Sequence, residues 1–534
     1  MEVGVYQYGN MVLIGVIIYM LVMLGIGWWS SKKIKTSTDY IVAGRRLPLF
    51  FTIGTLFATW FCAGTLMGAT AQAYLFGNQG VIFDPWGAAL CLILAGIFFV
   101  RMMRRGGYLT LVDYFDIRFG KKMGFASSIV LVIAEIGWVG AQLVAFGTIL
   151  QIFTGLPLAY GIIISCAVLI VYTYLGGMWS VTLTDVVQMI VLTVGIVIIL
   201  PYAIASIGGW DYFFSQAGNW GELPTFAIAP TAEEGYLWYF GVPGWFYYIA
   251  AWMAIGLGSI PAQDLMQRIL SAKDEKTAAV GSYVAGGLYL VVGMIPVILG
   301  IAMFELNANL TIPETEMILP WLAMNYLPPV LTTVFVAGMI AALMSSADSA
   351  LLATSSIIGY NGLKYIKPEA TSEEALKTTR LFVPIVAIFS LLLALYAETI
   401  YMLVVIAWSI ILVGLFAPFA AGYFWKKCNE TGALLALICG FASWIALSFY
   451  YYYAETAEAN IGIIEEGVVY VEWAMWDAVY IASTPAFFIS VVVMIVVSII
   501  TGKIDPAKPL ADLNGNPMKM VNWAGWGFNK NSDA

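Results

Sequence analysis

Thirteen long apolar runs, separated by short polar gaps, constrain this chain more than any other feature of its sequence. A helix needs about 20 apolar residues to cross the hydrocarbon core of a bilayer, and each run is near or above that length. The runs are 10–29, 49–77, 80–100, 123–153, 157–176, 179–206, 236–268, 276–304, 327–360, 378–397, 400–425, 432–453 and 476–501. The sequence therefore predicts an all-α polytopic membrane protein with about 13 transmembrane helices.

The basic residues predict the orientation of these helices. If the runs alternate in direction and the N-terminus lies outside, all 24 lysines and arginines fall in cytoplasmic loops or at their edges. The opposite loops carry acids and no base, which is the asymmetry that the positive-inside rule describes. We expect a multi-pass protein of the cell (plasma) membrane, with an extracellular or periplasmic N-terminus and a cytoplasmic C-terminus.

The composition excludes several classes of protein. The chain is 61% hydrophobic and only 10% charged, whereas soluble domains carry about 25% charged residues. It has no histidine, so a Ser-His-Asp triad and a histidine proton relay are excluded. Its five cysteines lie apart with no CxxC motif, which is typical of small buried residues. We expect no enzyme activity, no nucleic-acid partner and no obligate protein partner.

Five carboxylates lie inside apolar runs or at their ends, where this assignment places no basic residue. They are Asp84, Glu135, Asp185, Asp264 and Asp348. Acids at membrane depth are costly and usually functional, so each needs a cation or a proton. We expect a bound metal ion or a cationic solute. Two alternatives stay open: Asp264 pairs with Arg268 at i+4, and Glu135 is a protonated, hydrogen-bonded acid of the core.

Two of the runs are interrupted by helix-breaking residues. The second carries Gly64 and Gly68 near its middle, and the seventh carries Gly256, Gly258 and Pro261. Proline removes a helical hydrogen bond, and small residues allow a helix to unwind. Broken helices at matching positions of two halves are typical of the central binding site of a transporter. The alternative is that these glycines only allow close helix packing.

The two breaks are five runs apart, and a repeat with an odd number of spans must be inverted in the membrane. We therefore expect two inverted five-helix repeats with extra helices at both ends. The expected division is 1–48 (first extra helix and loop), 49–206 (first repeat), 207–235 (outer loop), 236–425 (second repeat), 426–502 (last extra helices) and 503–534 (cytoplasmic tail).

The ninth run contains a stripe of oxygen-bearing side chains, AALMSSADSALLATSS, at 341–356. Ala342, Ser345 and Ser349 share one helical face, flanked by Ser346 and Asp348. Hydroxyl and carboxylate oxygens are the ligands that a hard cation such as Na⁺ prefers. The alternative is that the serines bond to carbonyls of their own helix. Four serines and an acid in one short stretch favour ion binding, with Asp185 of the sixth run as a second carboxylate.

Two tryptophans are candidates for contact with a solute. Trp60 directly precedes the break of the second run, and Trp138 lies in the middle of the fourth. Indole faces attract quaternary or methylated ammonium ions by cation–π contact, worth about 2 kcal/mol when desolvated. Glu135 lies on the same helical face as Trp138 and would supply a counter-charge. The alternative, that both rings only pack in the core, is equally open for each alone.

At these motifs the chain resembles the sodium:solute symporter family, and closely so its choline-transporter branch. The resemblance covers residues 10–450 and rests on YIVAGRRLPLF, ATWF…GATAQAY, LGGMWSVTLTDVVQ, GSIPAQDLMQRILS, ETEMILP and AALMSSADSALLATSS. It implies a LeuT-like fold, in which an inverted five-helix repeat is joined by extra helices. It also implies sodium-driven alternating access.

The resemblance implies specific ligands. The family's main sodium site falls on the backbone of Ala58 and Phe61 with Ala342, Ser345 and Ser346. A second sodium position falls on Asp185, Ser345, Ser346, Asp348 and Ser349. Trp60 and Trp138 match two tryptophans of the choline cage, and the third falls on Ala262, which removes one wall. We expect one or two Na⁺ ions, with Trp60, Trp138, Glu135 and Ala262 around the solute.

Two classes of solute remain open. The absence of any intramembrane base in this assignment, together with the spare acids, favours symport of a small organic cation, such as a quaternary ammonium ion or a methylated amine. The alternative is an amino acid or short monocarboxylate, whose carboxylate would be met by Na⁺ and helix ends. The expected partners are therefore a small-molecule solute, sodium and the lipid bilayer.

Overall fold

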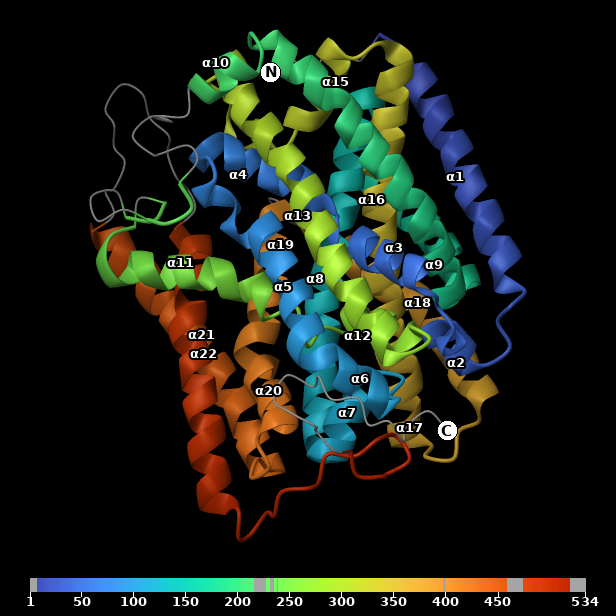
Figure 1. Cartoon of the computed structure of the whole chain (residues 1–534), viewed down its shortest axis with the longest axis vertical. Helices are drawn as coiled ribbons and strands as arrows, with labels where there is room; N and C mark the ends of the chain where they lie inside the picture. Colours follow the sequence, from blue (N-terminus) through green and yellow to red (C-terminus); the bar gives the residue numbers. More distant parts are fainter. Residues whose placement is uncertain are drawn as a thin grey trace.

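The structure is a computed structural model that describes residues 7–215, 227–230, 235–237, 239–396, 400–458 and 474–518. Figure 1 shows long helices that run side by side along the molecule. Most of the outer segments 207–235 and 454–475, and the end of the tail from residue 519, lie outside the described residues.

Ten of the described helical segments are long and apolar enough to cross a membrane, or up to eleven if one bent pair counts as a span. The ten are Gly9–Ser31, Gln79–Gly106, Lys121–Thr154, Thr173–Ser206, Glu275–Leu306, Pro329–Ile366, Ser372–Tyr396, Leu403–Phe424, Glu430–Tyr453 and Met475–Thr501. The bent pair is Leu49–Trp60 with Gly64–Phe76. The other two expected spans correspond to shorter helices, Leu158–Val171 and the broken seventh run.

The first repeat predicted from the sequence begins with the bent pair. Helix α3 (Leu49–Trp60) continues through a π-helical turn at Gly64–Gly68 into α4 (Ala69–Phe76), with a bend of 57°. It is followed by α5 (Ala88–Leu94), α6 (Val100–Gly106), the short α7 (Leu111–Arg118), α8 (Lys121–Thr154) and α9 (Leu158–Ser206). Helix α9 contains two expected spans, because Gly177 has a positive φ of 52° and kinks it.

The second predicted repeat also begins with a broken helix. Helix α11 (Gly241–Gly256) ends at the predicted glycines, and α12 (Gln263–Ser271) starts after an irregular stretch. The remaining helices are α13 (Glu275–Leu306), α15 (Ile318–Tyr326), α16 (Pro329–Ser356), α18 (Ser372–Tyr396), α19 (Ile400–Ile411) and α20 (Ala417–Phe424). The extra helices are α1 (Gly9–Ser31), α21 (Glu430–Glu458) and α22 (Ala474–Thr501).

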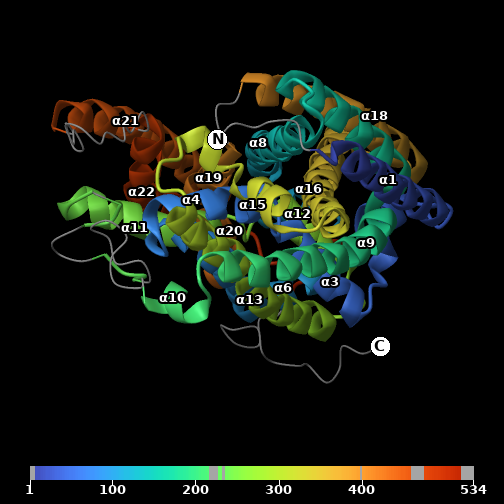
Figure 2. The ribbon, with the colours of Figure 1, turned by 90° about the horizontal axis from the view of Figure 1, so that it is seen from above.

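Helix α16 lies inside the bundle, whereas α1 lies at its edge, as the view from above shows (Figure 2). In α16 every residue from Phe335 to Ser356 is buried. In α1, apolar side chains such as Ile14 and Leu21 are exposed, as expected for a helix that faces lipid. The hydroxyl-rich stripe therefore lies in the protein interior, where its oxygens are shielded from lipid.

The basic residues of three short helices lie at one end of the molecule (Figure 1): Arg101, Arg104 and Arg105 of α6 (Val100–Gly106), Arg118 of α7 (Leu111–Arg118) and Lys364 of α17 (Leu363–Ile366). Figure 1 shows α6, α7 and α17 at this end together with α2 (Ser37–Val42), and α10 (Trp210–Ser215) and α15 at the other. The described part of the tail, up to residue 518, forms hydrogen bonds with this basic end. Arg118 donates a hydrogen bond to the Lys508 carbonyl at 2.6 Å, and the Leu513 N–H donates to the Gly106 carbonyl at 2.9 Å.

Candidate functional site

The break between α3 and α4 brings backbone carbonyls against the hydroxyl stripe of α16. After Trp60 the chain turns extended at Phe61 (φ −80°, ψ 91°), so the carbonyls of the last turn of α3 lack their usual helical partners. The Ser346 hydroxyl donates to the Thr59 carbonyl at 2.7 Å and lies 3.5 Å from the Ala58 carbonyl. The structure thus places two members of the expected first sodium site, Ala58 and Ser346, in contact.

Asp185 lies where three helices meet. The Ser345 hydroxyl of α16 donates to its Oδ1 at 2.6 Å, and the Thr55 hydroxyl of α3 donates to its Oδ2 at 2.5 Å. All three side chains are fully buried. Asp185 and Ser345, predicted from distant parts of the sequence as ligands of a second sodium ion, are therefore brought together, and Thr55 is an additional oxygen donor that the sequence did not indicate.

The prediction that the buried acids have no basic neighbour is wrong for Asp185. Arg268 is fully buried, and its Nη2 lies 3.9 Å from Asp185 Oδ2 and also contacts the Ser349 hydroxyl. The sequence predicts Arg268 at the last position of the seventh run, at the edge of a cytoplasmic loop. The run unwinds before α12, so α12 packs against α3 and α16 and carries Arg268 into the interior.

Arg268 also modifies the alternative proposed for Asp264. Its Nη1 donates to the backbone carbonyl of Asp264 at 2.8 Å, and its Nε donates to the Thr55 carbonyl at 3.3 Å. The i+4 neighbours therefore do meet, but through the main chain of Asp264. The carboxylate Oδ1 of Asp264 accepts the N–H of Leu265 at 2.7 Å, and Oδ2 has no hydrogen-bond partner among the described residues.

Ser349 connects the remaining members of the stripe. Its hydroxyl lies 2.5 Å from the Ser345 carbonyl and 3.2 Å from Asp348 Oδ1, and it is 3.5 Å from the Thr59 hydroxyl. Ala342 lies one turn before Ser345 and Ser346 on the same buried helix. Asp348 also interacts electrostatically with Tyr19 of α1, an extra helix. Asp348 and Asp185 are therefore linked through the serines rather than directly.

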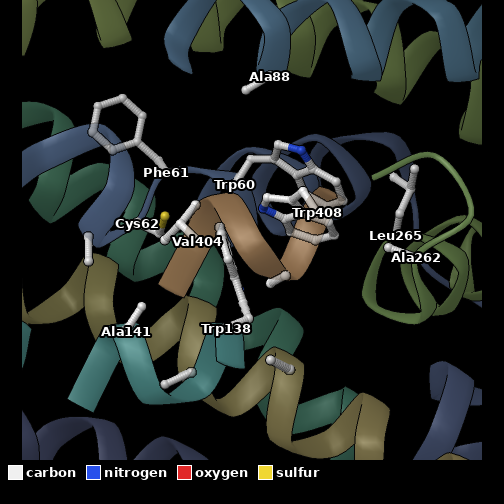
Figure 3. Packing of buried hydrophobic residues seen from close by; sticks show 14 of the residues in the cluster. Trp60, Phe61, Cys62, Ala88, Trp138, Ala141, Ala262, Leu265, Val404 and Trp408 are labelled. Atoms are coloured by element: carbon white, nitrogen blue, oxygen red, sulfur yellow. The ribbon is translucent and has the colours of Figure 1, made fainter. Parts of the chain in front are cut away.

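Three tryptophans from three helices gather beside the break (Figure 3). Trp138 of α8 and Trp408 of α19 stack edge to face with ring centroids 4.9 Å apart, and Figure 3 shows Trp60 of α3 next to Trp408. Each is only 2% exposed, and none of the three indole N–H groups has a hydrogen-bond partner among the described residues. Buried indoles usually donate a hydrogen bond, so this cluster presents unused donors and ring faces.

Ala262 lies close to this cluster, with Leu265 beside it (Figure 3). An alanine at this position presents no aromatic ring to the cluster, and the role of Ala262 beside the solute stays a prediction. Sequence reasoning did not identify Trp408, which supplies the third aromatic side chain from the opposite repeat. One feature of the sequence could have identified Trp408. It lies in the middle of an apolar run, whereas most tryptophans of membrane proteins lie near the membrane interfaces.

Glu135 is buried between α8 and the start of α12. It is 1% exposed, and neither carboxylate oxygen reaches a hydrogen-bond partner among the described residues. The backbone N–H groups of Gln263 and Asp264 face its carboxylate beyond hydrogen-bonding geometry, and the Asp264 carboxylate interacts with it electrostatically. The structure thus brings together two of the five predicted acids. The alternative of a hydrogen-bonded core acid stays open, with these two N–H groups as the donors nearest to forming such bonds.

Asp84 has neutral partners. Its Oδ2 accepts the Thr65 hydroxyl at 2.9 Å, and its Oδ1 accepts the Tyr289 hydroxyl at 2.7 Å. Both partners lie at depth, with Thr65 in the π-helical turn of the broken helix. Two neutral hydroxyl donors, which the sequence did not indicate, therefore hydrogen-bond the Asp84 carboxylate.

Comparison with known proteins agrees with this geometry. The family model described as "Sodium:solute symporter family" matches residues 40–440. The chain belongs to the sodium:solute symporter family. It is 30% identical to the high-affinity choline transporter 1 of Drosophila melanogaster over 80% of this chain and 69% of that protein. It is also 30% identical to the human high affinity choline transporter 1, over 80% and 75%.

More distant relatives have other solutes in their names. The chain is 26% identical to the sodium/glucose cotransporter of Vibrio parahaemolyticus over 81% of this chain and 84% of that one. Among solved structures, a Na⁺-coupled sialic acid symporter in a substrate-bound outward-open state matches with a TM-score of 0.72. It is 21% identical over 93% of this chain and 98% of that one, which establishes a shared fold.

A second structural match supports the same fold assignment. The nucleobase-cation-symport-1 family transporter Mhp1 matches with a TM-score of 0.54, at 14% identity over 88% of this chain and 95% of that one. The predicted all-α, LeuT-like fold is confirmed by these matches.

Proposed function

We propose that this symporter couples the inward movement of Na⁺ to the import of a small organic cation, a quaternary ammonium ion or a methylated amine. The observation that supports this most directly is the cluster of Trp60, Trp138 and Trp408, three buried rings whose N–H groups have no partner among the described residues. Ring faces in a dry site attract ammonium ions by cation–π contact of about 2 kcal/mol. The two choline transporters at 30% identity support the same class of solute.

The coupling ions would bind next to this cluster. A first Na⁺ would bind at Ala58 and Phe61 with Ala342, Ser345 and Ser346, and a second at Asp185 with Ser345, Ser346, Asp348 and Ser349. Trp60 lies between Ala58 and Phe61 at the end of α3, so solute and ion would share one helix break. Arg268 would compete with a second Na⁺, because its guanidinium contacts both Asp185 and Ser349.

Transport would follow alternating access in the cell membrane. The N-terminus would lie outside and the C-terminus in the cytoplasm, because the basic end of the molecule is retained on the cytoplasmic side. Sodium would bind from outside and stabilise an outward-open state before the solute enters. Each positive charge that moves inward gains about 2.3 kcal/mol per 100 mV of membrane potential, so a cationic solute would itself contribute to the driving force.

Uptake into proteoliposomes tests this proposal. We expect an inward Na⁺ gradient, but not a K⁺ gradient, to drive uptake of choline or a methylated amine. Trp60→Ala and Trp408→Ala should each weaken apparent affinity for the cation by about tenfold or more, from the loss of cation–π contact. Trp444→Ala is the matched control, because this buried indole already donates to the Val479 carbonyl at 2.9 Å.

The same assay contains the result that would overturn the proposal. The panel should include betaine, proline, acetate and glucose beside the amines. Sodium-driven uptake of acetate or proline with no uptake of any amine would assign the pocket to a carboxylate-bearing solute instead.

A further inference from the structure

We propose that Glu135 and Asp264 form a polar subsite beside the tryptophan cluster, and that it selects an ammonium ion that carries at least one N–H. This inference rests on the proposed function and narrows its solute to protonated primary, secondary or tertiary amines. The subsite lies between α8 and the N-terminus of α12, at the second of the two helix breaks.

The first support is the set of carboxylate oxygens without partners. Both oxygens of Glu135 and Oδ2 of Asp264 have no hydrogen-bond partner among the described residues, and both side chains are at most 1% exposed. A buried acceptor that is left without a hydrogen bond destabilises the folded protein, and more so when it is charged. Three such oxygens in one place indicate that a hydrogen-bond donor from outside the chain completes the site.

The second support is the position of the two acids next to the aromatic pocket. Glu135 lies three residues before Trp138 on α8, so the two side chains leave the same helical face. Asp264 lies two residues after Ala262, which Figure 3 shows near Trp60 and Trp408. A solute held against the indole rings would therefore have the carboxylates within reach on one side.

The third support is the balance of charge. Glu135, Asp185 and Asp264 each interact electrostatically with Arg268, the one base that all three share among the described residues, so with all three acids ionised the cluster would carry two surplus negative charges. One Na⁺ at Asp185 and one organic cation at Glu135 and Asp264 would bring it to neutrality. The guanidinium of Arg268 already contacts Asp185, Ser349 and the backbone carbonyl of Asp264. It forms no hydrogen bond with the carboxylate oxygens of Glu135 or with Oδ2 of Asp264.

The chemistry of the missing partner follows from these oxygens. A quaternary ammonium ion carries charge but no N–H, so it would leave all three oxygens without a hydrogen bond. A protonated amine supplies both the charge and one to three donors. A site built to hydrogen-bond a donor rejects an analogue that lacks it more strongly than a ring pocket rejects a change of one methyl group. Because residue 262 is an alanine, the side of the pocket next to Asp264 has no aromatic ring from this position.

The experiment compares two cations that differ by one methyl group. Sodium-driven uptake of labelled trimethylammonium and tetramethylammonium is measured in proteoliposomes, and the ratio of their kcat/KM values is the readout. We expect the wild-type protein to favour trimethylammonium by about tenfold or more. Glu135→Gln and Asp264→Asn should each bring the ratio towards one, mainly by raising the KM for trimethylammonium.

Asp477→Asn provides the matched control, because this buried acid already accepts hydrogen bonds from Tyr239 at 2.7 Å and Tyr247 at 2.8 Å. It should leave the ratio unchanged. A wild-type preference for tetramethylammonium, or variants that keep the wild-type ratio, would overturn the inference. If a variant does not fold, the wild-type ratio of kcat/KM for trimethylammonium to that for tetramethylammonium is by itself the test of the inference. Absence of sodium-driven uptake for either cation would instead contradict the proposed function.

Discussion

Arg268 determines how the buried carboxylates of this protein must be understood. Its guanidinium lies 3.9 Å from Asp185 and contacts Ser349, inside a region whose sequence indicates only acids and hydroxyls. A guanidinium at this position supplies part of the counter-charge when no Na⁺ is bound. Sodium binding at Asp185 would therefore require Arg268 to move away or to share its acceptors.

The hydroxyl of Ser345 provides a test at the scale of one residue. It donates to Asp185 Oδ1 at 2.6 Å and is a proposed ligand in both sodium sites. Ser345→Ala should raise the Na⁺ concentration for half-maximal uptake by about tenfold, the effect of one lost hydrogen bond to a charged group of about 1.5–3 kcal/mol. The measurement is the sodium dependence of uptake at saturating solute.

Ser355→Ala is the control, because its hydroxyl only donates to the Leu351 carbonyl of its own helix at 2.6 Å. An unchanged sodium dependence in the Ser345 variant would remove this serine from the sodium sites.

At the scale of the element, the two helix breaks differ in how tightly their glycines are packed. A Cβ added at Gly258 would lie 2.6 Å from the Trp408 carbonyl and would also clash with the Ala254 carbonyl. A Cβ at Gly64 would make only ordinary contacts, at 3.5 Å or more, with Asp84, Cys62 and Val404. The break in the seventh run is therefore held open by close backbone approach, and the one in the second run is not.

This difference predicts unequal effects of the same substitution. Gly258→Ala should destabilise the protein by about 1–3 kcal/mol or more, because the opposing atoms are backbone and cannot rotate away. Gly64→Ala should stay within about 1 kcal/mol of the wild type. Thermal unfolding in detergent and transport activity measure both variants. Equal losses in the two would show that the glycines act through flexibility rather than through packing.

The short helix α7 carries a carboxyl group that responds to pH. Burial raises the pKa of Asp116 from its ordinary value of 3.8 to about 6, and the hydrogen bond from Tyr365 at 2.7 Å opposes only part of this. A carboxyl whose pKa is raised by folding favours the folded state below about pH 4, and that contribution is lost as the pH rises through 6. Wild-type protein should therefore gain stability relative to Asp116→Asn on acidification from pH 7.5 to 4.5.

Asp512 in the tail supplies a control of opposite sign. Burial acts to raise its pKa, but hydrogen bonds from the Asn516 side chain and nearby backbone N–H groups outweigh this and lower it. Asp512→Asn should be less stable than the wild type at neutral pH, because it lacks the stabilising charged form of Asp512. This difference in stability should shrink on acidification, as the wild-type carboxylate becomes protonated. Melting temperatures of the variants across this pH range test both signs, and a flat difference for Asp116→Asn would contradict the first.

At the scale of the whole molecule, the distribution of charge predicts that lysine side chains react with reagents from one side of the membrane only. All lysines are assigned to the cytoplasmic side, so a membrane-impermeant amine reagent applied to intact cells should modify no lysine side chain. Permeabilised cells should be modified readily. Asn309→Lys, at an exposed position in the segment expected outside, is the control that should react in intact cells. Mass spectrometry of the purified protein reads out each site, and a native lysine labelled from outside would refute the orientation.

The distribution of hydrophobic residues alone determined several properties of this protein. The length and apolarity of the runs predicted a polytopic helical protein, and the motifs identified the family, which the comparisons confirm. The helix break near Gly256 and Gly258 was also visible, because glycine and proline act locally on the backbone. The proposed sodium ligands Ser345 and Asp185, which are 160 residues apart in the sequence, do meet.

Tertiary structure alone decided the electrostatics of the site and the composition of its aromatic walls. The sequence predicts Arg268 at the end of the seventh run, at the edge of a loop. Only the packing of α12 against α3 and α16 brings its guanidinium to Asp185. Trp408 likewise reaches Trp138 only because α19 and α8 pack together. Glu135 and Asp264 face each other for the same reason. Local sequence encodes backbone preference and apolarity, whereas contacts between distant side chains depend on how the helices pack around the two breaks.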